Sequence, residues 1–230
     1  MKHLMQNAGK TFNTFLFDMD GVVVDSMPAH AGSWRKIFHE FGLTLEDVDI
    51  FKREGMAGLD SIAEIFFEKN SVVPAIHELL MLQERKISVF EKYDLKIFDE
   101  IPGILSFLKN SIMKTALVTG SMRRSVDFML DNRLQSLFDA IVTVDDVERG
   151  KPFPDPYLKA LHLLDSSTDE SLVIENAPMG IRAAKAAFLT CVAIETTLPS
   201  EYLQEADYIV TSHGQLLSYL HNVCGAPASS

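Results

Sequence analysis

The sequence predicts an α/β fold, a doubly wound parallel sheet with an all-helical domain inserted after its first strand. Short apolar segments alternate with helical patterns from Lys114 onward, which is typical of a parallel sheet covered on both faces. By contrast, no segment between Met27 and Tyr93 has a strand pattern. We therefore expect residues 1–26 and 95–230 to form the core and residues 27–94 to form a separate helical domain.

The composition limits the class of protein. The 230 residues, 47% hydrophobic and 23% charged, can bury a sizeable core as one large domain or two small ones. A formal net charge of -11 argues against nucleic acid or an anionic membrane as a partner, because both usually require a basic patch. The segment Met1–Asn13 has no apolar core of the signal-peptide type, and no run approaches the ~18 apolar residues of a membrane span. We expect a cytoplasmic protein.

The first predicted strand is the apolar run Phe15–Phe17, which leads directly into two aspartates and a glycine. Side chains two residues apart in a strand point to the same side, so Asp18 and Asp20 would face one reaction space. Such a pair could provide a nucleophile and an acid. Asp and Gly also dominate ordinary turns, so this segment alone leaves both interpretations open.

The inserted domain follows at once. Pro28 suits the first turn of a helix, with Ser26 close upstream as a possible cap. His30 lies on the apolar stripe of this helix, where a histidine is either a packing residue or a functional one. Further helical patterns cover Asp60–Lys69 and Pro74–Tyr93.

The second half of the chain repeats a strand-then-helix unit. The units pair Lys114–Thr119 with Ser121–Leu130, Ala140–Val144 with Asp155–Leu164, and Ser171–Glu175 with Ala177–Phe188. Further strands are predicted at Thr190–Ile194 and Tyr208–Val210, and a last helix at Gln215–Leu220. Ligands of open parallel sheets bind beyond the carboxyl ends of the strands, so the residues at those ends should be chemically useful.

One such strand end is the triplet Thr119, Gly120 and Ser121. A hydroxyl group together with free backbone N–H groups at a helix N-terminus can bind phosphate. The same triplet could equally be an ordinary turn in which Ser121 caps the next helix.

Two later strand ends carry Lys151 and the pair Glu175 and Asn176. Lys151 is either a solvated loop charge or a cation that holds a phosphoryl oxygen and offsets carboxylate repulsion. The oxygens of Glu175 and Asn176 could complete a magnesium site with Asp18, because Mg²⁺ prefers carboxylate and carbonyl ligands. Alternatively, Asn176 only caps the helix that begins near Pro178.

Taken together, these strand ends and the helical insertion resemble the haloacid dehalogenase superfamily, in its β-phosphoglucomutase-like and phosphatase-like branch with a helical cap. The resemblance covers nearly the whole chain. It is carried by Phe17–Val22, Thr119, Lys151-Pro152 and Glu175–Gly180. It implies a Rossmann-like core beneath the inserted cap.

The resemblance also implies roles for these residues. Asp18 would be the nucleophile that accepts the phosphoryl group, and Asp20 would be the acid and base. Mg²⁺ would lie among Asp18, the backbone carbonyl of Asp20, and Glu175 or Asn176. The groups that would bind phosphoryl oxygens are Thr119, Gly120, Ser121 and Lys151, and His30 would position the acid.

The chain departs from the family pattern in two places that matter. Asn176 stands where the family often has a second acidic residue. In the cap, Glu54 and Gly58 stand where mutases of this branch have a lysine and an arginine for the substrate's second phosphate. Because a glutamate would repel that phosphate, the cap favours hydrolysis.

The sequence thus predicts a magnesium-dependent phosphatase for a small phosphorylated metabolite, such as a sugar or polyol phosphate. The alternatives are a mutase of the β-phosphoglucomutase type and a catalytically silent binding protein on the same fold. We expect no nucleic-acid or membrane partner, and a monomer or weak homo-oligomer.

Replacing Asn176 by aspartate should make the protein bind Mg²⁺ more tightly. A carboxylate oxygen binds Mg²⁺ more strongly than an amide oxygen, so Asn176→Asp should reach half-maximal activity at a several-fold lower Mg²⁺ concentration. Initial rates measured against Mg²⁺ concentration test this. An unchanged or weaker dependence in the variant would contradict it.

Overall fold

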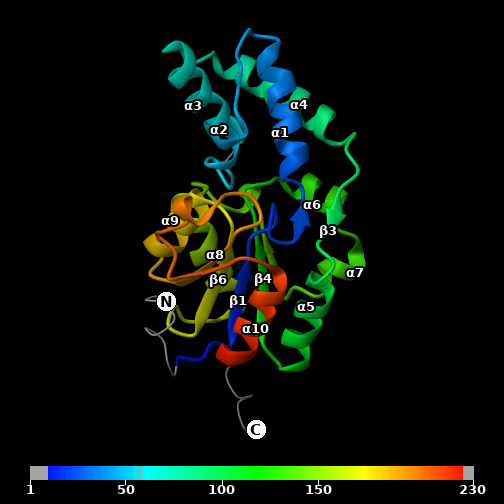
Figure 1. Ribbon diagram of the computed structural model, residues 1–230, viewed down its shortest axis with the longest axis vertical. Coiled ribbons are helices and arrows are strands. Elements are labelled where there is room, and N and C mark those ends of the chain that lie inside the picture. The colour runs from blue at the N-terminus through cyan, green and yellow to red at the C-terminus, as the bar shows by residue number, and fades with distance from the viewer. Residues whose placement is uncertain (1–9, 57, 225–230) are drawn as a thin grey trace.

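The computed structural model describes residues 10–56 and 58–224, and its centre is a six-stranded parallel sheet (Figure 1). The strand order is β5-β4-β1-β6-β7-β8. The strands are β1 (Thr14–Phe17), β4 (Lys114–Val118), β5 (Ala140–Val142), β6 (Ser171–Glu175), β7 (Thr190–Ile194) and β8 (Tyr208–Val210). The chain adds strands first on one side of β1 and then on the other, so the predicted doubly wound sheet is confirmed.

Both faces of the sheet are covered by helices. From β1, Phe15 and Phe17 enter one apolar cluster and Leu16 enters another, because alternate side chains of a strand point to opposite faces. The first cluster includes residues of α5 (Ile101–Asn110), α6 (Arg123–Met129), α7 (Asn132–Gln135) and α10 (His213–Val223). The second includes residues of α8 (Asp155–Leu164) and α9 (Pro178–Ala186). The strands are therefore apolar on both sides.

Four helices lie beyond the carboxyl edge of the sheet and form the cap (Figure 1). They are α1 (Met27–His39), α2 (Asp47–Phe51), α3 (Gly58–Asn70) and α4 (Ile76–Phe90). The cap has an apolar cluster of its own, which includes Trp34, Phe38, Ile62 and Leu82. The predicted all-helical insertion is confirmed, while its limits at residues 27 and 94 stay a prediction.

The two connections between core and cap run side by side. The strand β2 (Val24–Asp25) pairs with β3 (Lys96–Ile97) in an antiparallel ribbon. This ribbon was not predicted, because two-residue strands leave no alternation pattern. The helix α5 was also not predicted, since Pro102 and Gly103 near its start indicate a turn, although proline is well tolerated in a first helical turn.

Two local expectations were wrong. Ser26 stands at the N-cap of α1, but its side chain accepts no backbone N–H of the helix, because its backbone is helical (φ -100°, ψ -12°) and not extended as in most caps; its hydroxyl donates to Asp20 Oδ1 at 2.6 Å. The helix expected at Ser121 begins at Arg123, so the triplet Thr119–Ser121 lies in the turn before it.

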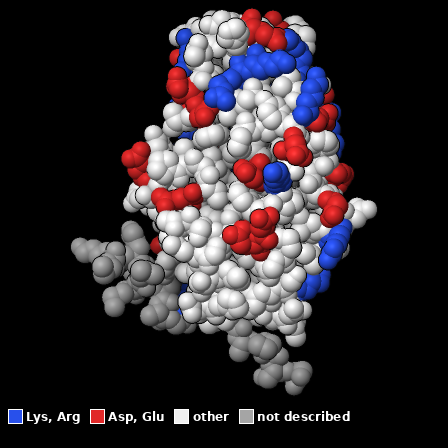
Figure 2. Space-filling model, turned by 45° about the vertical axis from the view of Figure 1, so that its right-hand side comes forward, with Lys and Arg blue, Asp and Glu red and all other residues white. Residues whose placement is uncertain are grey.

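Within residues 10–56 and 58–224, no helix is long and apolar enough to cross a membrane. Most of the segment Met1–Asn13, in which we expected no signal peptide, lies outside the described residues. On the face drawn in Figure 2, acidic and basic side chains are interspersed, and the basic ones are concentrated in the upper part.

The loop between α9 and β7 contains a strained residue. Phe188 has a φ of +60° and its side chain is 89% exposed, so no packing offsets the strain. Glycine is the usual residue at such a position after a helix. We expect Phe188→Gly to raise the free energy of unfolding by about 1 kcal/mol in urea denaturation. Phe188→Ala is the matched control: it removes the ring but keeps Cβ, so a gain as large as that of glycine would contradict the explanation.

Candidate active site

The sheet brings three strand ends together around Asp18. Phe17, at the end of β1, is level with Leu117 of β4 and Ile174 of β6. Asp18, the next residue, donates its backbone N–H to the Ile174 carbonyl at 2.9 Å. The residues that follow β4 and β6 must therefore flank Asp18, as the sequence predicted.

Lys151 holds this assembly together. Its Nζ donates to Asp18 Oδ1 and Glu175 Oε1, both at 2.6 Å, and to the Val118 carbonyl at 3.0 Å. Lys151 is only 2% exposed, so it is not the solvated loop charge that the sequence left open. Tyr157, from α8, adds a hydrogen bond to Glu175 Oε1 at 2.7 Å.

Burial and charge shift the pKa values of this group. Burial raises the pKa of Asp18, the Lys151 ammonium opposes this shift, and the negative charges of Glu175 and Asp20 reinforce it. Burial alone would lower the pKa of Lys151, but the carboxylates of Asp18 and Glu175 raise it well above its ordinary value. Lys151 is therefore a permanent cation beneath the carboxylates.

Asp20 is held by a different set of donors. Its Oδ1 accepts from Ser26 at 2.6 Å and lies 3.0 Å from His30 Nε2, while its Oδ2 accepts from the Ser121 hydroxyl at 3.1 Å. Burial would raise the pKa of Asp20, but the His30 ring, the Ser26 hydrogen bond and the nearby Lys86 lower it to about 2. Asp20 is a carboxylate in this arrangement.

His30 connects Asp20 to the cap helix α4. Its Nδ1 lies 2.7 Å from Lys86 Nζ. A charged ammonium can only donate, so Nδ1 accepts from Lys86, and Nε2 carries the proton that His30 donates to Asp20. Burial lowers the pKa of Lys86 to about 8, although the charges of Glu54 and Asp20 oppose the shift.

The triplet Thr119–Ser121 after β4 forms a turn and contacts both Asp20 and the cap. Thr119 Oγ1 accepts the Ser121 N–H at 3.0 Å, which closes the turn, and the Ser121 hydroxyl is directed at Asp20 and not at a helix N-terminus. Gly120 meets the cap: a Cβ built there would lie 2.3 Å from the Gly55 carbonyl oxygen. The contact between cap and core therefore requires glycine at this position.

The cap loop also brings a carboxylate to the site. Glu54 lies in a group with Asp20 and His30 whose ligand atoms are all within 4.8 Å of one another. Burial and the charge of Asp20 raise the pKa of Glu54. The Lys86 ammonium supplies a positive charge beside this group, because its Nζ lies 2.7 Å from His30 Nδ1.

The residues expected to hold a metal are a different set, Asp18, Glu175 and Asn176. Asn176 is fully buried, and its Oδ1 has no hydrogen-bond partner among residues 10–56 and 58–224. An unpaired oxygen at this depth is unfavourable unless a ligand completes it. Together with Asp18 and Glu175, Asn176 offers the hard oxygen atoms that suit Mg²⁺.

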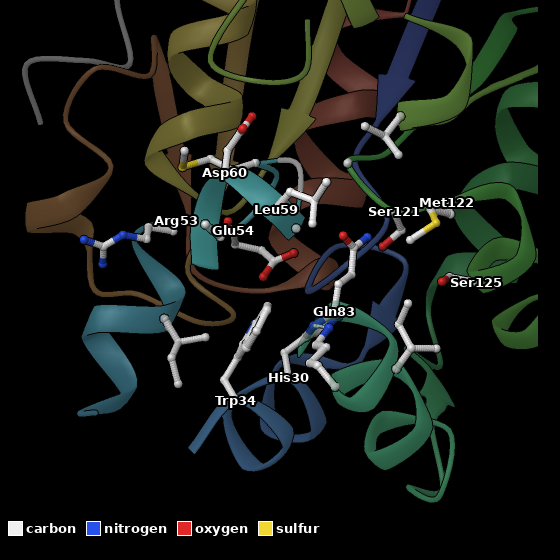
Figure 3. A pocket seen from close by; sticks show the side chains of 18 of the residues that line it. His30, Trp34, Arg53, Glu54, Leu59, Asp60, Gln83, Ser121, Met122 and Ser125 are labelled. Atoms are coloured by element: carbon white, nitrogen blue, oxygen red, sulfur yellow. Dashed lines mark hydrogen bonds between the residues drawn. The ribbon is translucent and has the colours of Figure 1, made fainter. Parts of the chain in front are cut away.

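A cavity of about 440 Å³ between cap and core lies beside these groups (Figure 3). In Figure 3, Glu54 from the cap loop, Gln83 from α4 and Ser121 from the core point toward a common space, with the Trp34 ring on one side. Gln83 Oε1 is buried without a hydrogen-bond partner among the described residues. The cavity is large enough for a small metabolite.

Sequence reasoning missed several of these contacts. Lys86 carried a signal, since it lies on the stripe of α4 whose other buried residues are Leu79, Leu82 and Phe90, and a lysine on such a stripe needs a partner. Gln83 and Tyr157 carried no comparable signal, because polar groups at the edge of an apolar face are common.

Three comparisons bear on the identity of the chain. The model of the haloacid dehalogenase-like hydrolase family matches residues 15–194. The chain is 30% identical over 208 residues to Hexitol phosphatase A of Escherichia coli (88% of this chain, 92% of the relative), and 27% identical over 218 residues to Pyrophosphatase PpaX of Bacillus mycoides (93% and 99%). It is similar to a solved structure from Bacteroides vulgatus, described as "Putative beta-phosphoglucomutase", with a TM-score of 0.85 and 30% identity (95% of this chain, 91% of that chain).

The lowered pKa of Lys86 predicts a pH dependence of stability. Lysine titrates near 10.4 in an unfolded chain, so between about pH 8 and 10 the unfolded state binds more protons at Lys86 than the folded state. The free energy of unfolding of the parent should therefore rise with pH in this window. Its difference from that of Lys86→Met should change by on the order of 2 kcal/mol. Urea denaturation at pH 7 to 10 measures this difference.

The control for loss of a lysine charge is Lys36→Met, because Lys36 is exposed on the cap. A difference between the parent and Lys86→Met that stays constant from pH 7 to 10 would contradict the prediction.

Proposed function

Because the chain belongs to the haloacid dehalogenase-like hydrolase family, in its phosphatase-like and β-phosphoglucomutase-like branch, we propose that it is a phosphatase. Its activity depends on magnesium, and its substrate is a sugar or polyol phosphate. The observation that carries the proposal is the Lys151 ammonium at 2.6 Å from Asp18, with Asp20 two residues away on its own set of donors. This arrangement supports a nucleophile and a separate proton carrier.

In the first step, an Asp18 carboxylate oxygen attacks phosphorus and the bond to the leaving oxygen breaks, which gives an aspartyl-phosphate. Asp20 gives a proton to the leaving oxygen. It then takes one from the water that attacks phosphorus, and the bond between the Asp18 oxygen and phosphorus breaks to release inorganic phosphate. The pKa of about 2 belongs to Asp20 before substrate binds; a phosphoryl group beside it would raise that pKa, since like charges oppose ionisation. Lys151 and Thr119 would hold phosphoryl oxygens.

Mg²⁺ would be held by Asp18, the main-chain carbonyl of Asp20, and Glu175 or Asn176, and would supply neutralisation of the charge on the transferred group. Both Glu175 oxygens already accept hydrogen bonds, Oε1 from Lys151 and Tyr157 and Oε2 from the Asn176 N–H. The unpaired Oδ1 therefore favours Asn176 as the ligand.

The cavity supports a neutral, hydroxyl-bearing leaving group. Glu54 borders it where a mutase has a cation for a second phosphate, and Gly58 leaves the other cationic position without a side chain. Gln83 Oε1 is an unused acceptor that a substrate hydroxyl could satisfy. The name of the Escherichia coli relative, Hexitol phosphatase A, agrees with a polyol phosphate.

The alternative is a phosphosugar mutase of the β-phosphoglucomutase type, which the name of the Bacteroides vulgatus structure favours. A mutase would use the same core residues and would return the phosphoryl group to a substrate hydroxyl. Glu54 argues against it, because a carboxylate beside the cavity repels the second phosphate of a bisphosphate intermediate.

The test is phosphorus NMR of the purified protein with hexitol phosphates, sugar monophosphates and pyrophosphate, each with and without Mg²⁺. We expect stoichiometric release of inorganic phosphate from a sugar or polyol phosphate that requires Mg²⁺. Asp18→Asn should lower the rate by about 10³-fold or more. Asp25→Asn, at an exposed aspartate of the same segment, should retain the rate.

Movement of phosphate between positions without release would support the mutase instead. Release from pyrophosphate alone would refute the assigned substrate class.

A further inference from the structure

The two polar atoms of the Asn176 amide differ in their hydrogen bonding. Its Nδ2 donates to Thr197 Oγ1 at 3.0 Å, while Oδ1 is buried and unpartnered among residues 10–56 and 58–224. The side chain is 0% exposed, so water at the protein surface does not reach the amide. The Thr197 hydroxyl is thus the contact that orients the amide.

Thr197 belongs to the loop after β7, which lies beside β6 in the sheet, with Ala193 level with Glu175. The preceding residue, Thr196, donates its hydroxyl to the Gly21 carbonyl, in the segment that carries the two catalytic aspartates. One short loop therefore contacts both halves of the proposed metal site.

Gly21 makes room for this arrangement. A Cβ built at Gly21 would lie 2.0 Å from Asn176 Nδ2 and 2.9 Å from Thr197 Oγ1. Its φ of +82° is also one that residues with a side chain rarely adopt. Asn176 and Thr197 thus meet against the bare backbone of the catalytic loop.

We propose that Thr197 is a positioning residue for the cation: its hydroxyl accepts from Asn176 Nδ2 and so stabilises the amide orientation in which Oδ1 is left available as a ligand. The proposal rests on the magnesium dependence of the proposed function. An amide differs from a carboxylate in that only one of its two ends can bind a cation. Turned by 180°, the amide would present N–H donors to Mg²⁺.

The free energy that stabilises this amide orientation comes from the hydrogen bond of the buried Nδ2. The hydrogen bond to Thr197 contributes about 1 kcal/mol, and without it the ligand-presenting orientation leaves a buried donor unpaired. Groups that orient metal ligands typically change metal affinity by about 10- to 100-fold when they are removed. Thr197 should act at the lower end of that range because it contacts a single ligand.

The test is a calorimetric titration of the metal-free protein with Mg²⁺ alone, without any phosphate ester. Thr197→Val removes the hydroxyl and keeps the shape, and we expect the dissociation constant to rise by about tenfold. Thr197→Ser restores a hydroxyl and should bind within about twofold of the parent. Thr190→Val makes the same change at the other end of β7, away from the site, and should bind as the parent does.

A second arm separates positioning from a general structural effect. In an Asn176→Ala background, Thr197→Val should cause no further loss of Mg²⁺ affinity, because the amide through which it acts is gone. An equal loss in that background, or Thr197→Val with parental affinity, would overturn the proposal, as would a parent that binds no Mg²⁺.

The titration also distinguishes this proposal from the proposed function. Mg²⁺ binding that weakens in Thr197→Val would uphold the role of Thr197 even if the protein released no phosphate from any ester. Conversely, Mg²⁺-dependent phosphatase activity with unchanged affinity in that variant would uphold the function and refute the role.

Discussion

The buried ammonium of Lys151 is the interaction on which the rest of the structure depends. A lone charge at 2% exposure would be strongly destabilising, so Lys151 can occupy this position only where several acceptors meet. Those acceptors come from the ends of three adjacent strands: Asp18 after β1, the Val118 carbonyl of β4 and Glu175 of β6. The order of the central strands is therefore a condition for the site as much as a result of folding.

The balance of charge supports the proposed cation in the core. Asp18, Asp20 and Glu175 are three carboxylates around the single Lys151 ammonium, which leaves two negative charges in excess. The cap adds Glu54 and Lys86, one charge of each sign. The cap residues thus leave the core's excess unchanged. Burial raises the pKa of Asp18, and the neighbouring charges of Glu175 and Asp20 raise it further against the opposing Lys151 ammonium. A divalent cation is opposite in sign to that excess and equal to it in magnitude, which supports the proposed magnesium site.

The sequence predicted the parts of the fold and site that follow from strand ends. That Asp18, Lys151 and Glu175 lie together was predictable because parallel strands bring their carboxyl ends to one edge; the roles of these residues and of Asn176 stay predictions. Contacts across the cap were not predictable in this way. The approach of Lys86 to His30 depends on how α4 packs against α1, and no periodicity encodes that packing. The contact of Ser26 with Asp20 was likewise missed, because a capping rule considers only the local helix and Asp20 reaches Ser26 only in the folded site.

In the proposed metal site, asparagine at position 176 has a structural consequence beyond a weaker bond to the cation. An aspartate there would offer two equivalent oxygens and would need no group to orient it, but it would add a third excess negative charge beside Asp18. Asn176 keeps the excess at two negative charges, but an amide needs a hydrogen-bond partner at its Nδ2 end to orient it. Thr197 meets that need from the neighbouring strand end, at a place that only the bare backbone of Gly21 leaves open. Asparagine at position 176 thus explains the presence of the Thr197 hydroxyl and of Gly21, which phosphoryl transfer alone would not require.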